Sequence, residues 1–174
     1  CRCIRAASLE QRESYAEEER RHVLSNLPII NSDVHNQTFE SFNVSDGNYQ
    51  KERWRVLQVI RSWARNEMGA NAPPRTVLMY GPVGTGKTHL AIAALRDVLS
   101  RGASARYENA QELLLHRLRP SYISEFNENN IEILDTAKGV DYLVLDDLGS
   151  EKASEFTRSS LYDIIEHRIR NAKW

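Results

Sequence analysis

The eight residues from Gly81 to Thr88 have the types and spacing of a phosphate-binding loop. They read Gly-Pro-Val-Gly-Thr-Gly-Lys-Thr and satisfy the pattern G-x-x-x-x-G-K-[ST]. Glycines let successive backbone N–H groups converge on an anion, and a helix that follows points its positive end at the same anion. We expect Lys87 to reach the outer phosphates of a nucleotide and Thr88 to ligate Mg²⁺. The alternative is a glycine-rich turn that matches the pattern by chance, but such a turn gives no structural reason for a lysine and a threonine at these two positions.

The candidate nucleotide-binding residues are the loop and the histidine that follows it. Gly81 and Gly86 are the positions that we expect to be hardest to replace, because the backbone must bend sharply there. For His89 an alternative stays open, in which it packs against a neighbouring strand and takes no part in catalysis. The full candidate set is Gly81, Pro82, Val83, Gly84, Thr85, Gly86, Lys87, Thr88 and His89.

Two adjacent acids, Asp146 and Asp147, follow the apolar run 142–145. Such a run is typical of a strand covered on both faces of a parallel sheet, and ligands bind at the carboxyl ends of such strands. Adjacent buried acids destabilise a fold unless a cation compensates them. Because successive side chains of a strand face different directions, we assign Asp146 to the Mg²⁺ shell and Asp147 to polarising an attacking water. The alternative is an acidic turn leading into Leu148.

The elements that must position these residues alternate between strand and helix. Apolar residues Val56, Ile60, Trp63 and Ala64 recur at helical spacing and predict an amphipathic helix over about 48–67. This alternation predicts an α/β fold with a parallel sheet flanked by helices. Strand patterns lie at 76–80, 105–107 and 142–145, and further helix patterns lie at 90–99, 109–118, 128–137 and 156–171.

Composition fits one ordinary domain and excludes several classes of protein. The chain has 174 residues, of which 41% are hydrophobic and 27% charged. With 23 basic and 24 acidic side chains, the net charge of -1 argues against a strongly basic nucleic-acid binder. Apolar runs are too short to cross a membrane and no signal peptide is visible, so we expect a cytoplasmic protein without membrane contact.

Both ends of the sequence suggest a piece of a longer chain. The first residue is Cys1 rather than methionine, and Trp174 directly follows a helical pattern that has no cap, glycine or proline to end it. Cys1 and Cys3 are two possible ligands for Zn²⁺, whose structural sites need four, so the others would lie upstream. The alternative is two free thiols in a reducing cytosol.

Taken together, the loop 81–88, the run Tyr-Leu-Val-Leu-Asp-Asp-Leu-Gly at 142–149 and the helix pattern around 161–165 resemble one group of ATPases. The group is the bacterial helicase-loader branch of the AAA+ class, with DnaC and DnaI type loaders and IstB type transposition helpers. The stretch 38–42 resembles the segment that lines the adenine pocket in this group. The resemblance implies a P-loop core over 38–174, incomplete at its carboxyl end. It also implies that 1–37 is the end of an amino-terminal region with a linker helix.

The resemblance also implies a function. ATP and Mg²⁺ would bind in the crevice and Lys87, Asp146 and Asp147 would support hydrolysis by water. Partners would be single-stranded DNA, a replicative helicase or a transposase, and other copies of the chain when ATP is bound. Sensor and arginine-finger residues would lie beyond Trp174, so we expect low activity from this piece alone. Two other classes stay open: a small-molecule kinase, and a noncatalytic module in which ATP only holds a surface in place.

Nucleic-acid contact has a weaker signal, a local excess of arginine between the loop helix and the acidic strand. These arginines could follow a phosphate backbone, and in loader-like proteins the corresponding segment touches single-stranded DNA. Tyr107 and Tyr122 are candidates for stacking on bases, although core packing is the stronger expectation for Tyr107. The arginines of this segment are Arg101, Arg106, Arg117 and Arg119, whereas Arg158, Arg168 and Arg170 read as solvent-facing charges.

Overall fold

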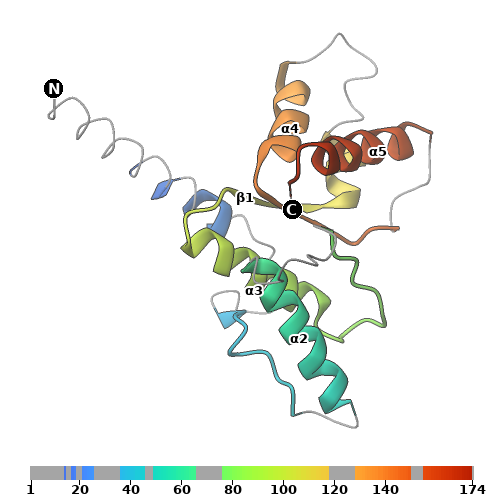
Figure 1. Cartoon of the computed structure of the whole chain (residues 1–174). Coiled ribbons are helices and arrows are strands. Elements are labelled where there is room, and N and C mark those ends of the chain that lie inside the picture. Colours follow the sequence, from blue (N-terminus) through green and yellow to red (C-terminus); the bar gives the residue numbers. More distant parts are fainter. Residues whose placement is uncertain are drawn as a thin grey trace, which may run out of the picture.

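A computed structural model shows helices packed on both faces of a parallel β-ribbon (Figure 1). None of the helices among the described residues is both long and apolar enough to cross a membrane. The structure describes residues 14, 17–18, 21–25, 36–45, 49–65, 76–117, 128–149 and 155–173. The elements are α2 (Gln50–Ala64), α3 (Lys87–Ser100), β1 (Ala105–Asn109), the π-helix η2 (Glu112–Arg117), α4 (Glu128–Gly139), β2 (Tyr142–Asp146) and α5 (Glu155–Arg170).

Strand β2 lies between two hydrophobic cores. It pairs in parallel with β1, so that Ala105 is opposite Tyr142 and Asn109 is opposite Asp146. Its side chains alternate: Tyr142 and Val144 pack into the core built from α2 and α3. Leu143 and Leu145 pack against the core that includes residues of α4 and α5. The prediction of a strand covered on both faces is confirmed, because each face of β2 contributes to a different core.

Helices form one layer on each side of the strands. Helices α2 and α3 lie on one side, below the strands in Figure 1, and α4 and α5 lie on the other side, above them. Helix α3 is the most deeply buried of them, because apolar residues occupy most of its circumference. Ile92, Leu95 and Val98 are fully enclosed there. The expected α/β fold with helices flanking a parallel sheet is confirmed.

Helix α2 differs from the predicted stripe at one end. Ile60, Trp63 and Ala64 are buried as expected, but the fourth buried position is Leu57 and Val56 is 44% exposed. The Trp63 ring meets the Tyr142 ring edge-on with centroids 5.5 Å apart. This aromatic contact fixes the carboxyl end of α2 against the beginning of β2.

The strand predicted at 76–80 is not formed: these residues are assigned to no strand and do not pair with β1 or β2 among the described residues. Val77 and Met79 pack against the first core, whereas Leu78 and Tyr80 are 72% and 89% exposed. Alternate side chains therefore face the core and the solvent, as they do in a strand that is covered on one face. The prediction of a strand over 76–80 is therefore wrong for this part of the structure, because forming a strand requires a partner that local sequence does not reveal.

The chain after β1 begins its helix as predicted but winds it differently. The Asn109 side chain accepts a hydrogen bond from the backbone N–H of Glu112 at 3.1 Å and so caps the turns that follow. The turns that follow form the π-helix η2, with Leu113 and Leu114 fully buried in the second core. Leu118, the last residue of the helix predicted over 109–118, lies outside the described residues.

Arg168 is the largest departure from the sequence analysis, which placed it in solvent. It is 6% exposed and its guanidinium donates hydrogen bonds to the carbonyl oxygens at the end of α4 and before β2, those of Ala137, Lys138, Val140 and Asp141. Burial lowers its pKa to about 10, so the guanidinium stays charged at neutral pH. Arg158 and Arg170 are exposed, as predicted.

Helix α5 ends at Arg170 although the sequence offers no glycine or proline there. Ala172 takes a left-handed conformation with φ of 55°, and the Lys173 N–H donates to the Arg168 carbonyl at 2.9 Å. This is the hydrogen-bonded ending that glycine normally provides. The sequence pattern showed no residue that would end this helix, and this expectation was wrong because Ala172 adopts the left-handed conformation that ends it.

Candidate functional site

The loop 81–88 bends through conformations that favour glycine. Gly86, at the N-cap of α3, has φ of 92°, and Gly81 has φ of 148°. A Cβ added at Gly86 would lie 2.6 Å from Cε2 of Phe42, closer than real Cβ atoms approach a neighbour. Gly86 is thus constrained twice, by its backbone conformation and by the aromatic ring beside it.

Lys87 folds back over its own loop. Its ammonium donates hydrogen bonds to the carbonyl oxygens of Gly81 and Pro82, both at 2.9 Å. The Thr85 hydroxyl donates to the same Pro82 oxygen at 2.9 Å. A cation at the amino-terminal end of α3 adds to the positive end of the helix dipole, so the loop is attractive to an anion.

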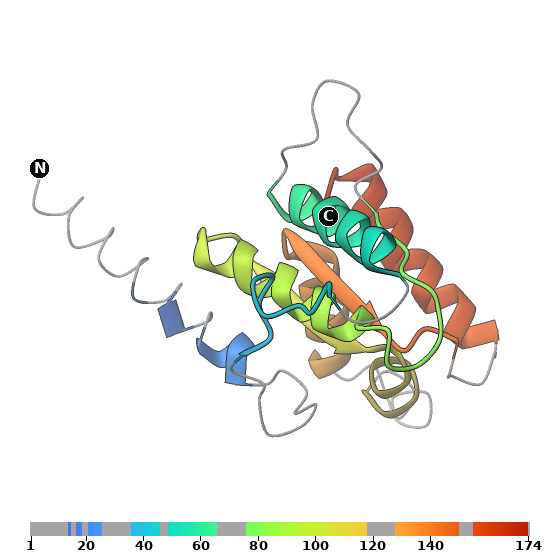
Figure 2. The same ribbon diagram turned by 90° about the horizontal axis from the view of Figure 1, so that it is seen from below.

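Chain connectivity brings the loop and the two acids to the same end of the sheet. Helix α3 runs away from the loop, and residues 101–104 return the chain into β1, which therefore runs back toward the loop. Because β2 is parallel to β1, Asp146 lies at the end from which α3 starts. Figure 2 shows the arrowhead of β2 near the first turn of α3. That Lys87, Thr88 and the two acids act together on one nucleotide remains a prediction.

Each acid has its own hydrogen-bond donor on β1. The Tyr107 hydroxyl donates to Asp146 Oδ2 at 2.7 Å, and the Asn109 amide donates to Asp147 Oδ2 at 3.1 Å. Asp147 also donates its backbone N–H to Asp146 Oδ1 at 2.9 Å. With φ of 56°, Asp147 turns the chain out of the strand, so the two carboxylates have different surroundings.

Sequence reasoning did not predict that Tyr107 and Asn109 contact the two acids. Burial raises the pKa of the Tyr107 phenol, and its hydrogen bond to Asp146 raises it further, so the hydroxyl remains a donor. Tyr107 also packs against the first core, which was the stronger expectation for it. The missing information was the register of β1 on β2, because only that register places Asn109 opposite Asp146.

His89 attaches the segment 36–45 to helix α3. Its Nε2 lies 2.9 Å from the Thr38 carbonyl oxygen and 3.3 Å from Ser41 Oγ. Its ring meets the Phe42 ring edge-on, with centroids 5.3 Å apart. These contacts of His89 are with the turn at 36–45 and not with a strand. Phe42 in turn touches the loop at Gly86.

The arginines expected to track nucleic acid are bound within the fold where the structure describes them. Arg101 pairs with Asp97 at 3.0 Å and donates to the Ala64 carbonyl, which ties α3 to α2. Arg106 pairs with Glu108, whose side chain is buried. The side chain of Arg117, and Arg119 and Tyr122 altogether, lie outside the described residues.

The donors at this end of the sheet suit a hard cation. The Thr88 hydroxyl and the Asp146 carboxylate are oxygen ligands of the kind that Mg²⁺ takes together with substrate phosphates. The described residues contain no group of three or more histidine, cysteine or acidic side chains that could hold a metal alone. Cys1 and Cys3 lie outside the described residues, so zinc stays a prediction.

A phosphate loop that caps a helix, with acids ending a buried parallel strand beside it, defines a P-loop nucleotide-binding protein of the AAA+ type. The chain belongs to the family described as IstB-like ATP binding protein, whose sequence profile matches residues 8–173. The resemblance of the sequence to the AAA+ group that contains IstB and DnaC is confirmed.

Curated relatives include two replication proteins. The chromosomal replication initiator protein DnaA of Aquifex aeolicus is 31% identical over 131 residues, which cover 74% of this chain. The replicative helicase loader DnaC of Escherichia coli is 22% identical over 165 residues, or 95% of this chain. The solved structure of AMPPCP-bound DnaA from Aquifex aeolicus superposes with a TM-score of 0.64 at 27% identity, covering 84% of this chain and 41% of that one.

The chain spans only part of these relatives. The matched region is 29% of the Aquifex aeolicus DnaA and 62% of the Escherichia coli DnaC. Family membership therefore establishes an ATP-binding core, and the activity and partners of a whole protein require a separate proposal.

Proposed function

We propose that this chain is the ATP-hydrolysing core of a DNA-replication switch that acts like a helicase loader. The observation that supports this most is the placement of loop 81–88 and of Asp146 and Asp147 at the same end of the parallel strands. The relatives named as replicative helicase loaders support the replication role. In this proposal the chain binds ATP, single-stranded DNA and a helicase, and ATP promotes association with further copies.

The loop residues would bind the phosphates. Backbone N–H groups of the loop and the amino-terminal end of α3 attract the anion, and Lys87 exchanges the carbonyl oxygens of Gly81 and Pro82 for phosphate oxygens. Thr88 and Asp146 would hold Mg²⁺. The ion, when bound, neutralises charge that develops on the phosphates during transfer.

Asp147 would orient the attacking water. Its carboxylate accepts a hydrogen bond from Asn109, and one oxygen therefore has a fixed direction. In this role the Asp147 carboxylate would accept a hydrogen bond from a water molecule and so direct the water's oxygen lone pair toward the terminal phosphate. Tyr107 restrains Asp146 in the same manner, so β1 positions both acids.

Two substitutions test the hydrolytic part in the full-length protein. Lys87→Ala should abolish binding of a fluorescent ATP analogue, because the outer phosphates lose their cation. Asp147→Asn should still bind the analogue but release phosphate at least about a hundredfold more slowly. Asp135→Asn, at an exposed position of α4, controls for the loss of one negative charge. Unchanged turnover in Asp147→Asn would instead favour a noncatalytic nucleotide module.

A second measurement tests the DNA part. Labelled single-stranded DNA should bind the full-length protein with ATP, and Lys87→Ala should lose this binding. If DNA does not bind while ATP does, the replication role is wrong. Transfer of phosphate to a small-molecule acceptor would then indicate a kinase.

A transposition helper is the second candidate function, because the matching family profile is that of IstB-like proteins. The phosphate site would serve either role, and the difference lies in the partner. Capture of a purified replicative helicase by the ATP-bound protein supports loading. Capture of a purified transposase, with no helicase bound, supports the alternative.

A further inference from the structure

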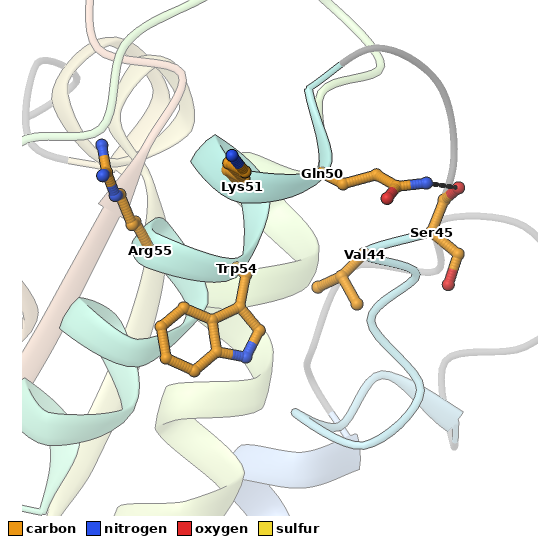
Figure 3. Close-up of a pocket in the computed structure, with 6 residues that line it drawn as sticks. All are labelled: Val44, Ser45, Gln50, Lys51, Trp54 and Arg55. Atoms are coloured by element: carbon orange, nitrogen blue, oxygen red, sulfur yellow. Dashed lines mark hydrogen bonds between the residues drawn. The ribbon is translucent and has the colours of Figure 1, made fainter.

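A pocket lies between the turn at 44–45 and the amino-terminal part of α2 (Figure 3). It has a volume of about 350 Å³, enough for a small planar ligand. The Gln50 amide donates to the Ser45 carbonyl oxygen at 2.9 Å, and the Arg53 guanidinium donates to the Asn43 carbonyl oxygen at 3.0 Å. These hydrogen bonds fasten the turn to the helix. The residues that line the pocket are Val44, Ser45, Gln50, Lys51, Trp54 and Arg55.

One aromatic ring and two cations dominate this pocket. Trp54 is 55% exposed, although indole rings are normally buried in large part. Lys51, Trp54 and Arg55 are spaced i, i+3 and i+4 and therefore share one face of α2. Figure 3 shows the indole beside Val44, with Lys51 and Arg55 extending from the same helix. The acid of this helical turn, Glu52, does not line the pocket.

The two cations are available to a ligand. Neither Lys51 nor Arg55 makes an ion pair or hydrogen bond within the part of the chain that the structure describes. Arg101 and Arg106, by contrast, are paired with Asp97 and Glu108. Among the described residues, α2 therefore offers unpaired positive charge for a phosphate backbone, whereas Arg101 and Arg106 do not.

We propose that this pocket binds one base of single-stranded DNA, with the base stacked on Trp54 and flanking phosphates near Lys51 and Arg55. An exposed aromatic ring with adjacent cations is the combination that binds single strands, since every base has a flat face. A duplex does not fit this role, because its bases are stacked on one another. The inference rests on the proposed DNA function and adds the place of contact.

Binding of a labelled thymidine oligonucleotide to the full-length protein, followed by anisotropy at several salt concentrations, tests the pocket. Trp54→Ala should weaken binding about tenfold, and Trp54→Phe should recover part of the loss because a ring remains. Changing Lys51 and Arg55 together to Gln should reduce the slope of log affinity against log salt by about 1.4, for two lost phosphate contacts. Tyr162→Ala and Arg158→Gln remove an exposed ring and an exposed cation from α5 and should change neither quantity.

Binding of a fluorescent ATP analogue to the same variants separates the inference from the proposed function. If the wild type binds the oligonucleotide and the Trp54 and Lys51/Arg55 variants bind it equally well, the pocket is not the contact and the proposed function stands. If Trp54→Ala weakens ATP binding and leaves oligonucleotide binding unchanged, the pocket holds the base of ATP and the inference is wrong. If the wild type binds ATP but no oligonucleotide, both the inference and the DNA part of the function fail.

Discussion

The ring of Phe42 occupies the space that a side chain at Gly86 would need, with Cε2 of the ring 2.6 Å from the position of a Cβ there. Phe42 precedes Gly86 by 44 residues in the sequence and is itself buried. The shape of the phosphate loop is therefore set by packing against residues 36–45 as well as by its own glycines. This contact leads to the first prediction.

Gly86→Ala should destabilise the chain by about 1–3 kcal/mol from the left-handed backbone, and the clash with Phe42 adds to this. We also expect loss of ATP binding, because the loop must change shape. Thermal unfolding and binding of a fluorescent ATP analogue measure the two effects. Gly139→Ala is the matched control: Gly139 ends α4 with open space around it, so stability should stay the same or rise by up to about 1 kcal/mol.

Arg168→Met should destabilise the fold by about 2–4 kcal/mol, because buried carbonyl groups lose a charged donor. The carbonyl oxygens of Ala137 and Val140 are those most dependent on it. Urea denaturation compares this variant with Arg170→Met, whose exposed side chain should matter by less than about 0.5 kcal/mol. Equal effects of the two substitutions would contradict the anchoring role of Arg168.

Asn109→Asp should separate the two tasks of Asn109. The new carboxylate still accepts the Glu112 N–H bond, so the start of the following helix is kept. It loses the donor to Asp147 and places a like charge beside it. On the proposed function, turnover of ATP should fall by about 10- to 100-fold with a smaller change in unfolding temperature. A drop in stability alone, with normal turnover, would show that Asn109 serves only the fold.

Ionised Asp141 should stabilise the fold at neutral pH, and this contribution should be lost in acid. The Lys173 ammonium, 2.8 Å from Asp141 Oδ1, holds the pKa of this carboxyl below its usual value against the opposing effect of burial, and Ser104 adds hydrogen bonds. A carboxyl whose pKa is lower in the folded state stabilises the fold at pH values above its unfolded-state pKa of about 3.9. This stabilisation is lost as the pH falls through the folded-state pKa. The effect is modest, because the side chain is 46% exposed.

The measurement for Asp141 is the free energy of unfolding of wild type and Asp141→Asn at neutral pH and below about pH 3.9. The wild type should be more stable at neutral pH, and the difference should shrink in acid. Asp135→Asn controls for the charge alone. A difference that stays constant across this range would mean that the Lys173 contact does not act through ionisation.

Local patterns were enough to predict the phosphate loop and β2. The loop is a motif of fixed spacing, and an unbroken apolar run such as 142–145 requires burial on both faces. The direction of the chain through α3 and β1 then brings Lys87 and Asp146 to one end of the sheet without any knowledge of side-chain contacts.

Contacts between distant segments were not predictable from these patterns. Arg168 looks like a surface cation in its own helix, and only the packing of α5 beside the end of α4 shows what it donates to. The hydrogen bond between Asn109 and Asp147 can be predicted only when the strand register is known. Residues 76–80 pair with neither β1 nor β2 among the described residues, and that outcome depends on the arrangement of the whole sheet. Local sequence sets conformation, whereas pairing and burial depend on which segments meet.

The segment 36–45 contacts both the phosphate loop and the pocket on α2 that we propose for a DNA base. Phe42 touches the phosphate loop at Gly86, and Val44 and Ser45, two and three residues later, line the pocket on α2. If binding at either place changes the conformation of this segment, the two binding equilibria are coupled through it. Thermodynamic linkage makes that coupling reciprocal: the factor by which ATP changes affinity at the pocket must equal the factor by which an occupant of the pocket changes affinity for ATP.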